Sequence, residues 1–252
     1  MVQKVGKLEQ YKLLNSSQIN PLYIPATAEY SLENLHLFLT KFNVVYIKHA
    51  TSGQGRGVFK LTKGKKQIHT LDGFSIHGKA INQELTIKQI HRQLQPFERL
   101  GRLSPYIIQE GIQSVTKSGQ PFIIRVHVQC VKGDWQVSGM LGTISFGQLE
   151  KSGIVNRSRG SQNLSIQELL NHHLRLNPEE ERGFLEKIRV VSIEVSKTIA
   201  SEYPTREYGL DVGVDTNLNP KIFEVNTTPG IAGFYYVDQQ IWHHIIENRK
   251  SR

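Results

Sequence analysis

Two short stretches late in the chain carry oxygen-bearing side chains at spacings that suit a metal ion. Asp211 lies in Tyr208–Asp215, and Glu224 and Asn226 lie in Lys221–Asn226. Side chains of a β-strand point to opposite faces in turn, so the alternation predicts a hairpin with these donors on one face. The apolar residues predicted on the other face are Leu210, Val212, Val214, Phe223 and Val225. Two carboxylates and an amide oxygen suit a small, hard cation such as Mg²⁺, with Mn²⁺ as an alternative, and favour nucleotide phosphate chemistry.

A lysine followed by a glycine-rich loop forms a second candidate site. Lys48 ends the apolar run Val44–Ile47, and the loop after it consists of Ser52, Gly53, Gln54, Gly55, Arg56 and Gly57. Glycines let backbone N–H groups approach an anion, and the lysine can reach a phosphate as a point charge. The lysine precedes the glycines and a strand is expected to follow, so this is not a P-loop. Two interpretations stay open, a phosphate-binding loop and an ordinary glycine-rich hairpin turn.

Two further predicted strands carry polar groups that can face a ligand. The first ends in Gln109, Glu110, Gly111 and Ile112, which can offer hydrogen bonds and an apolar contact to an adenine ring, or can form an ordinary strand end beside a turn. The second, Phe122–Gln129, places Arg125 opposite its apolar face. The Arg125 guanidinium can address a phosphoryl group, although a solvated strand face has the same pattern.

Composition limits the classes of protein to which the chain can belong. Its 252 residues suffice for one large or two small lobes, and no run of about 18 apolar residues predicts a membrane span. No apolar stretch follows the first lysines, which argues against a secretory signal. The single cysteine, Cys130, excludes an internal disulfide and a cysteine-ligated zinc site, favours a reducing compartment, and continues the apolar face of its strand, so it is predicted in the core.

The net charge of +9 is concentrated near the N-terminus. Residues 1–70 hold 10 Lys and Arg against 3 Asp and Glu. Such an excess can attract nucleic acid, an anionic surface or the triphosphate of a nucleotide. Aromatic residues do not alternate with the cluster Lys63, Lys65 and Lys66, as a base-stacking surface requires, so nucleic acid is the least favoured of these partners.

Helices and strands alternate along the chain without an internal repeat. Helices are predicted over Lys4–Leu14, after a cap at Ser31, and from Asn177 onward, where a cap, a proline and acidic residues coincide. Before the late hairpin, strands are predicted at Asn43–Lys48, Val58–Thr62, Gln67–Leu71, Phe74–Ile81, Tyr106–Glu110, Phe122–Val131 and Trp135–Ile144.

The order of these features resembles the ATP-grasp superfamily and, more narrowly, the YheC/YheD family of endospore coat-associated proteins. The matching stretches span roughly residues 5–235. They are Gly6–Leu8, Tyr23–Thr27, Val45–Lys48 with Ser52–Gly57, Ile108–Ile112, Pro121–Val126, Gly209–Asp211 and Phe223–Gly230.

This resemblance implies an α+β fold in which two lobes clasp ATP between them. It implies a single ATP-grasp domain over residues 1–252, with a smaller nucleotide-clasping lobe over about 40–110 and a larger lobe with the metal site over 111–235. Residues 1–39 are expected to form N-terminal helices packed on this domain, and residues 236–252 a C-terminal helix. The full domain that precedes this fold in many ligases is expected to be absent.

The resemblance also implies roles for individual residues. Lys7 and Lys48 are expected on the phosphates and Arg125 near the γ-phosphate. Asp211, Glu224 and Asn226 are expected on the metal. The segment Gln109–Ile112 is expected at the adenine.

Departures from the family pattern put part of the chemistry in doubt. Such proteins commonly show an acid where this chain has Ile123, and an arginine where it has Gly142 and Thr143. Asn156 matches a family asparagine of the nucleotide site, and Arg157 and Arg159 beside it can replace some of the missing charge.

Three functions therefore remain. The first is an ATP-dependent carboxylate–amine or carboxylate–thiol ligase that acts through an acyl phosphate, with ATP, an unidentified carboxylate and an unidentified nucleophile as partners. The second is a catalytically weak nucleotide-binding structural protein of the spore coat, associated with other coat proteins. The third is a nucleic-acid-binding protein. The resemblance places the chain in the cytoplasm, in the mother cell or on the spore coat.

Overall fold

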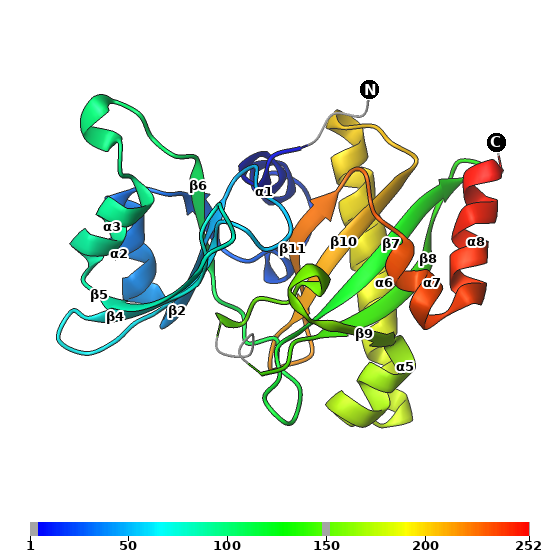
Figure 1. Ribbon diagram of the computed structural model, residues 1–252. Helices are drawn as coiled ribbons and strands as arrows, with labels where there is room; N and C mark the ends of the chain where they lie inside the picture. The colour runs from blue at the N-terminus through cyan, green and yellow to red at the C-terminus, as the bar shows by residue number, and fades with distance from the viewer. Residues whose placement is uncertain (1–4, 148–151, 252) are drawn as a thin grey trace.

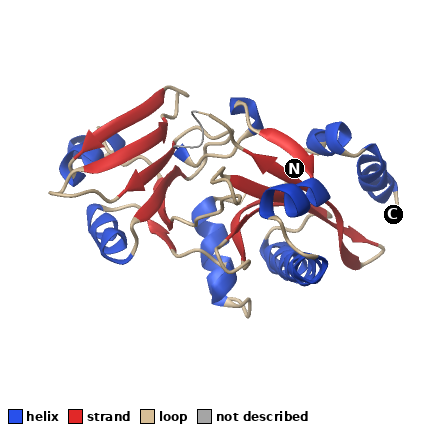
Figure 2. Ribbon diagram, turned by 90° about the horizontal axis from the view of Figure 1, so that it is seen from below, coloured by secondary structure: helices blue, strands red, loops and turns tan. Residues whose placement is uncertain are grey.

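A computed structural model describes residues 5–147 and 152–251 and shows two α+β lobes side by side (Figure 1). The smaller lobe is built on a six-stranded antiparallel sheet of order β1-β6-β2-β3-β4-β5, and the larger lobe on a five-stranded antiparallel sheet of order β11-β10-β7-β8-β9. Helices cover both sheets (Figure 2). Among the described residues, no helix combines the length and the apolar character needed to cross a bilayer. The two-lobed arrangement agrees with the predicted fold class.

The smaller lobe packs two helices on its sheet. Its strands are β1 (Thr27–Glu29), β2 (Val44–His49), β3 (Val58–Thr62), β4 (His69–Phe74), β5 (Ala80–Leu85) and β6 (Tyr106–Glu110). Its helices are α2 (Leu32–Lys41) and α3 (Ile87–Leu94), followed by the short turn η2 (Glu98–Leu100). The Ser31 hydroxyl accepts a hydrogen bond from Asn34 N at 3.0 Å, so the predicted cap of α2 is confirmed. The buried face of α2, including Leu35 and Phe38, packs with Val45 and Ile47 of the sheet.

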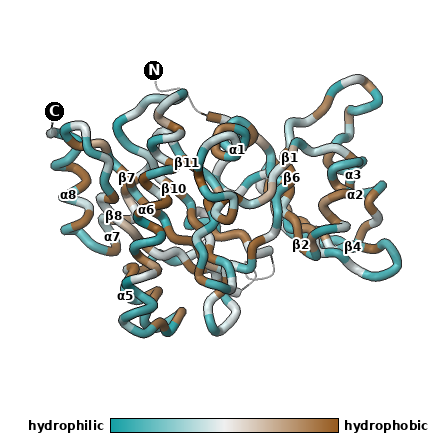
Figure 3. The backbone as a smooth tube through the Cα atoms, turned by 180° about the vertical axis from the view of Figure 1, so that it is seen from behind, coloured by the Kyte–Doolittle hydropathy of each residue, from teal (hydrophilic) through white to brown (hydrophobic). Residues whose placement is uncertain are grey.

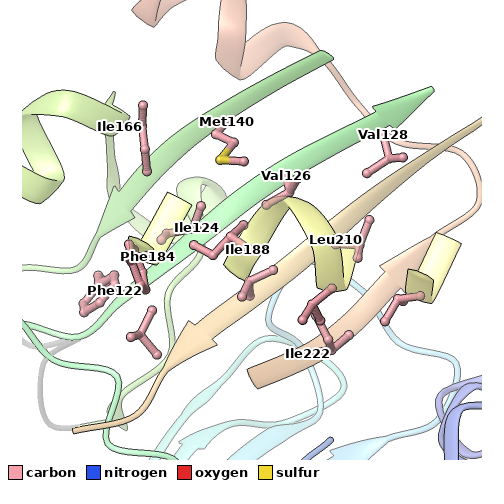
Figure 4. Packing of buried hydrophobic residues seen from close by; sticks show 14 of the residues in the cluster. Phe122, Ile124, Val126, Val128, Met140, Ile166, Phe184, Ile188, Leu210 and Ile222 are labelled. Atoms are coloured by element: carbon pink, nitrogen blue, oxygen red, sulfur yellow. The ribbon is translucent and has the colours of Figure 1, made fainter. Parts of the chain in front are cut away.

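The larger lobe packs its long helix against one face of its sheet. Its strands are β7 (Phe122–Val131), β8 (Asp134–Ile144), β9 (Gln162–Ser165), β10 (Glu207–Val214) and β11 (Pro220–Asn226). Helix α6 (Pro178–Glu202) begins at the predicted cap, where Asn177 and Glu180 form a reciprocal capping box. Ile124, Val126 and Leu210 of the sheet meet Phe184 and Ile188 of α6 in a single core (Figure 4).

Shorter elements complete this lobe. They are α1 (Lys7–Asn15), η1 (Pro21–Tyr23), η3 (Arg157–Arg159), α5 (Ile166–Glu168), η4 (Leu169–Leu174), α7 (Ala232–Val237) and α8 (Gln239–Lys250). Helix α1 contacts α6 and β11, whereas α2 contacts β2 and β6 of the smaller lobe, so residues 5–39 contribute to both lobes. The other face of the five-stranded sheet is covered in part by α7 and α8, where Phe234 and Ile245 are buried with Leu141.

Several predicted elements differ from the structure. The strand predicted over Phe74–Ile81 is wrong, because Ser75–Lys79 forms a turn: Ser75 N donates to Lys79 O at 2.9 Å and Gly78 has a φ of 83°. The chain turns there and pairs back as β5. The first helix starts at Lys7 instead of Lys4, which lies outside the described residues. Cys130 is half-buried and not in the core, because β7 ends one residue later, at the hairpin turn that leads into β8.

Candidate functional site

A cleft of about 840 Å³ lies between the two lobes and receives residues from both sheets. Most of the residues selected from the sequence line it. They are Lys7, Lys48, Ser52, Gly53, Gln54, Gly55, Gln109, Glu110, Gly111, Ile112, Arg125, Asn156, Asp211, Glu224 and Asn226. Hydropathy mapped on the chain shows apolar segments within each lobe and hydrophilic ones around them (Figure 3).

The oxygen donors lie on neighbouring strands of the larger lobe. Asp211 of β10 is paired with Glu224 of β11, and Gly209 is paired with Asn226, which agrees with the alternation seen in the sequence. On the other side of β10, Asp211 is paired with Arg125 of β7, and the Arg125 Nε atom lies 2.6 Å from Asp211 Oδ1. Three strands therefore bring two carboxylates, an amide and a guanidinium to one wall of the cleft.

The donor set fits a hard divalent cation. Asp211 Oδ1 is buried and, within the described part of the chain, has no partner with hydrogen-bond geometry, although the Arg125 charge is in contact with it. The Asn226 amide nitrogen donates to Gly209 O at 3.4 Å, which leaves the amide oxygen as the donor atom to a ligand. Over residues 5–147 and 152–251 no cluster of three or more His, Cys, Asp or Glu side chains suits a metal. Two carboxylates with an amide oxygen thus match Mg²⁺, which needs few protein ligands, better than Zn²⁺.

Electrostatics at Asp211 also favour a bound cation. Burial raises the pKa of Asp211, the Arg125 charge lowers it, and the Glu224 carboxylate raises it again, with a net increase. Two carboxylates so close together are mutually repulsive, and a divalent ion between them would remove that repulsion.

Lys7 contacts both lobes next to the candidate metal ligand Glu224. Its Nζ atom lies 3.2 Å from Glu224 Oε1 and donates to Ser52 O of the glycine loop at 3.1 Å. The ammonium group therefore neutralises Glu224 from the smaller-lobe side of the cleft. Gln10, one turn later on α1, fixes this helix to β11 through hydrogen bonds of 2.8 Å to both Val225 N and Val225 O.

Lys48 is held in place from the smaller lobe. Its Nζ donates to Gln109 Oε1 at 2.5 Å, and Gln109 Nε2 donates to Thr27 Oγ1 at 2.9 Å. Burial lowers the pKa of Lys48 to about 8, with Glu224 acting in the opposite direction. The Gln109 side chain thus binds Lys48, the lysine predicted to contact the phosphates. The expected contact of residues 109–112 with adenine stays a prediction.

A β-bulge on β11 turns Phe223 into the cleft. Pairing shifts between Asp211 and Val212, so that Val212 faces Ile222 and Phe223 has no direct partner. The prediction that Phe223 joins the apolar core face is therefore wrong: Ile222 and Val225 occupy the core, and the Phe223 ring lies 5.3 Å from Lys48 Nζ. Gly213 makes room for this ring, since a Cβ atom there would lie 2.0 Å from Phe223 Cζ.

Four predicted site residues do not line the cleft. Arg56 and Gly57 are the last residues of the glycine loop, and Gly57 has a φ of 62°. Arg159 Nε donates to Gln54 O at 3.3 Å and its guanidinium lies 3.7 Å from the Phe74 ring centre, so it joins the larger lobe to the glycine loop. Arg157 lies over the Tyr236 ring at 4.5 Å.

The two departures from the family pattern differ in their surroundings. Ile123 lines the cleft as an apolar residue. Gly142 faces away from the cleft, since a Cβ atom there would lie 3.1 Å from Leu169 Cβ. Thr143 donates to Asn163 Oδ1 at 3.0 Å and so is part of a local hydrogen bond. Neither Gly142 nor Thr143 supplies a charge to the cleft.

Sequence reasoning missed other lining residues, among them Tyr46, Lys60 and Lys221. Tyr46 Oη donates to Gly153 O at 3.3 Å, and Lys221 Nζ donates to Leu22 O at 2.6 Å. The signal for Tyr46 was present, because buried Val45 and Ile47 alternate with Tyr46 and Lys48 on the cleft face of β2.

Comparison with known proteins gives concordant results. A family described as YheC/D like ATP-grasp matches residues 3–249. The chain is 25% identical over 228 residues to the endospore coat-associated protein YheD of Bacillus subtilis (strain 168), covering 88% of this chain and 47% of the relative. It is 27% identical over 226 residues to YheC of the same organism, covering 87% and 58%. The chain thus spans about half the length of these relatives.

A solved structure shows a similar fold. The D-alanine-D-alanine ligase from Coxiella burnetii superposes with a TM-score of 0.52 at 11% identity, covering 97% of this chain and 58% of the ligase. At this identity the likeness concerns the arrangement of the elements alone.

Proposed function

Because this chain belongs to the YheC/D-like ATP-grasp family and has an ATP-grasp fold, we propose that it binds Mg-ATP in the cleft between its lobes and uses it to join a carboxylate to a nucleophile. The observation that carries the proposal is the convergence of Lys7, Lys48 and Arg125 with Asp211 and Glu224 in one cleft. These three cations and two carboxylates are groups of the kind that bind a triphosphate with a divalent ion.

Each charged group has a distinct part in phosphoryl transfer. Asp211, Glu224 and Asn226 would hold Mg²⁺ or Mn²⁺, which would neutralise the phosphate oxygens as charge develops on them. Lys48, fixed by Gln109, addresses the phosphates as a point charge. The guanidinium of Arg125 offers further N–H donors beside its contact with Asp211 and stabilises the transferred phosphoryl group.

The proposed reaction proceeds in two steps. A carboxylate oxygen of the substrate attacks the γ-phosphorus, the bond to the β-phosphate oxygen breaks, and ADP leaves. An amine or thiol then attacks the acyl carbon, inorganic phosphate leaves, and the nucleophile loses its proton. In this scheme the protein contributes positioning and electrostatic stabilisation.

A second candidate function is nucleotide binding without turnover. Ile123 and Gly142 favour it, because they place no charge where the family commonly carries an acid and an arginine. The relatives named YheD and YheC are endospore coat-associated proteins, so either function is proposed to serve the spore coat, from the mother cell or within the coat itself.

A thermal-shift assay separates these functions. Mg-ATP is expected to raise the Tm of the wild type and not of Glu224→Ala, while Glu84→Ala, at an exposed position on β5, retains the shift. ADP release that depends on an added carboxylic acid then supports the ligase. A shift without ADP release across a broad set of acids supports the structural binder, and a wild type without any shift refutes both.

A further inference from the structure

The loop between α3 and β6 exposes large apolar side chains on the smaller lobe. It projects outward from that lobe (Figure 1). Phe97, Leu100 and Leu103 are 57%, 70% and 69% exposed. Single exposed leucines are common on protein surfaces, but three large apolar side chains within seven residues form a patch of the kind found where proteins bind partners or membranes.

The loop is held in a defined conformation. At its base Gln95, which is buried, donates from Nε2 to Ser104 O at 2.9 Å and accepts from Ser104 N at 2.6 Å. At its tip Leu100 N donates to Phe97 O at 2.9 Å, and Gly101, with a φ of 68°, closes the turn with a bond from its N–H to Glu98 O at 2.8 Å. Hydrogen bonds thus fix the backbone that exposes the apolar side chains to solvent.

Positive charge accompanies the apolar side chains. Arg99 and Arg102 alternate with Leu100 and Leu103. The acid within the loop, Glu98, is held against α3, with its Oε2 atom 2.8 Å from His91 Nε2. Residues 27–110, which form most of the smaller lobe, carry 12 Lys and Arg against 6 Asp and Glu. The surroundings of the loop therefore favour an anionic surface.

We propose that this loop docks the protein onto a bilayer that contains anionic lipids, with Phe97, Leu100 and Leu103 in the interfacial region and Arg99 and Arg102 on the headgroups. The loop projects from the lobe and carries both apolar and basic side chains, a combination that suits a bilayer interface. None of the five side chains lines the cleft. Docking therefore leaves the nucleotide site open, and the inference is independent of the proposed function.

Co-sedimentation of the full chain with lipid vesicles tests the proposal. We expect binding to vesicles of phosphatidylcholine mixed with phosphatidylserine and little binding to phosphatidylcholine alone. The double variant Leu100→Ser/Leu103→Ser should lose most of the binding, and each arginine replaced by glutamine should weaken it about fivefold. Leu37→Ser, an exposed leucine on α2 of the same lobe, should bind as the wild type does.

Three results would overturn the proposal. They are no binding to the anionic vesicles, equal binding by the wild type and the double leucine variant, and a wild-type dimer in analytical ultracentrifugation that the leucine variant dissociates, since a second copy would then cover the loop. Unchanged Tm values and nucleotide-induced shifts in the variants show that the fold and the cleft are intact.

Discussion

Replacement of Lys7 by methionine should affect metal binding and nucleotide binding in opposite directions. In the structure the Lys7 ammonium lies 3.2 Å from Glu224 Oε1 and occupies the side of Glu224 that faces the glycine loop. Under the proposed function it would compete with Mg²⁺ for this carboxylate when no nucleotide is bound. With nucleotide bound it would be available to the phosphates. Methionine keeps the apolar stem and removes the charge.

The size of the effect follows from the geometry. Two unit charges 3.2 Å apart attract by roughly 5 kcal/mol at an effective dielectric constant of about 20. The net contribution is smaller, because the Lys7 and Glu224 side chains are only 11% and 32% exposed and their desolvation opposes the attraction. A hydrogen bond to a charged group contributes about 1.5–3 kcal/mol. We therefore expect Lys7→Met to bind Mg²⁺ alone about 10- to 100-fold more tightly and Mg-ATP more weakly by a similar factor.

Isothermal titration calorimetry measures both affinities on the same protein. Lys12→Met, at an exposed position of the same helix, is the matched control and should leave both unchanged. The reasoning is refuted if Lys7→Met weakens the binding of Mg²⁺ alone, because Lys7 would then support the metal site instead of competing for it.

Three further outcomes are expected. The pKa of Lys48 is lowered to about 8, so its positive charge is present below that pH and lost above it. ATP affinity should therefore fall by up to about tenfold per pH unit above pH 8. In titrations over the same pH range the Lys48→Arg variant should show no such fall, because arginine keeps its charge. Gly213→Ala places a Cβ atom against the Phe223 ring and should lower the free energy of unfolding in urea by about 1–3 kcal/mol. It should also weaken ATP binding. An unchanged midpoint of urea unfolding would contradict the close contact between Gly213 and the Phe223 ring. Burial alone would raise the pKa of Glu207, but hydrogen bonds from His127 and Arg249 bring it to about 2, below the usual carboxylate value. The Glu207 carboxylate therefore stabilises the fold fully above about pH 4.5, and this contribution is lost as the pH falls through 2. Glu207→Gln should lower the free energy of unfolding by up to about 2 kcal/mol at neutral pH. The difference in Tm between this variant and the wild type should shrink as the pH is lowered.

The alternation of apolar and polar residues was sufficient to predict the central hairpin. Asp211 and Glu224 face each other across β10 and β11 because a side-chain period of 2 fixes which residues share a face. The caps at Ser31 and Asn177 were also predictable, because a helix cap depends on residues only a few positions apart. Features that depend on neighbouring residues can therefore be predicted from the sequence.

Features that depend on a change of register or on distant segments were not predictable in this way. The bulge at Phe223 adds a residue to one strand without a composition signal, and so reverses the face of that ring. The turn near Gly78 was missed because Phe74–Ile81 contains enough apolar residues to suggest one strand. The contacts of Lys7 with Glu224 and of Lys221 with Leu22 join segments about 200 residues apart, and only the folded chain brings them together.

Anomalous diffraction from crystals grown with Mn²⁺ and a non-hydrolysable ATP analogue tests the central claim most directly. We predict a Mn²⁺ peak in the cleft, coordinated by oxygens of Asp211, Glu224 and Asn226 and of the bound triphosphate. A triphosphate bound with its metal away from these three side chains, or a cleft that stays empty at saturating nucleotide, would contradict the account.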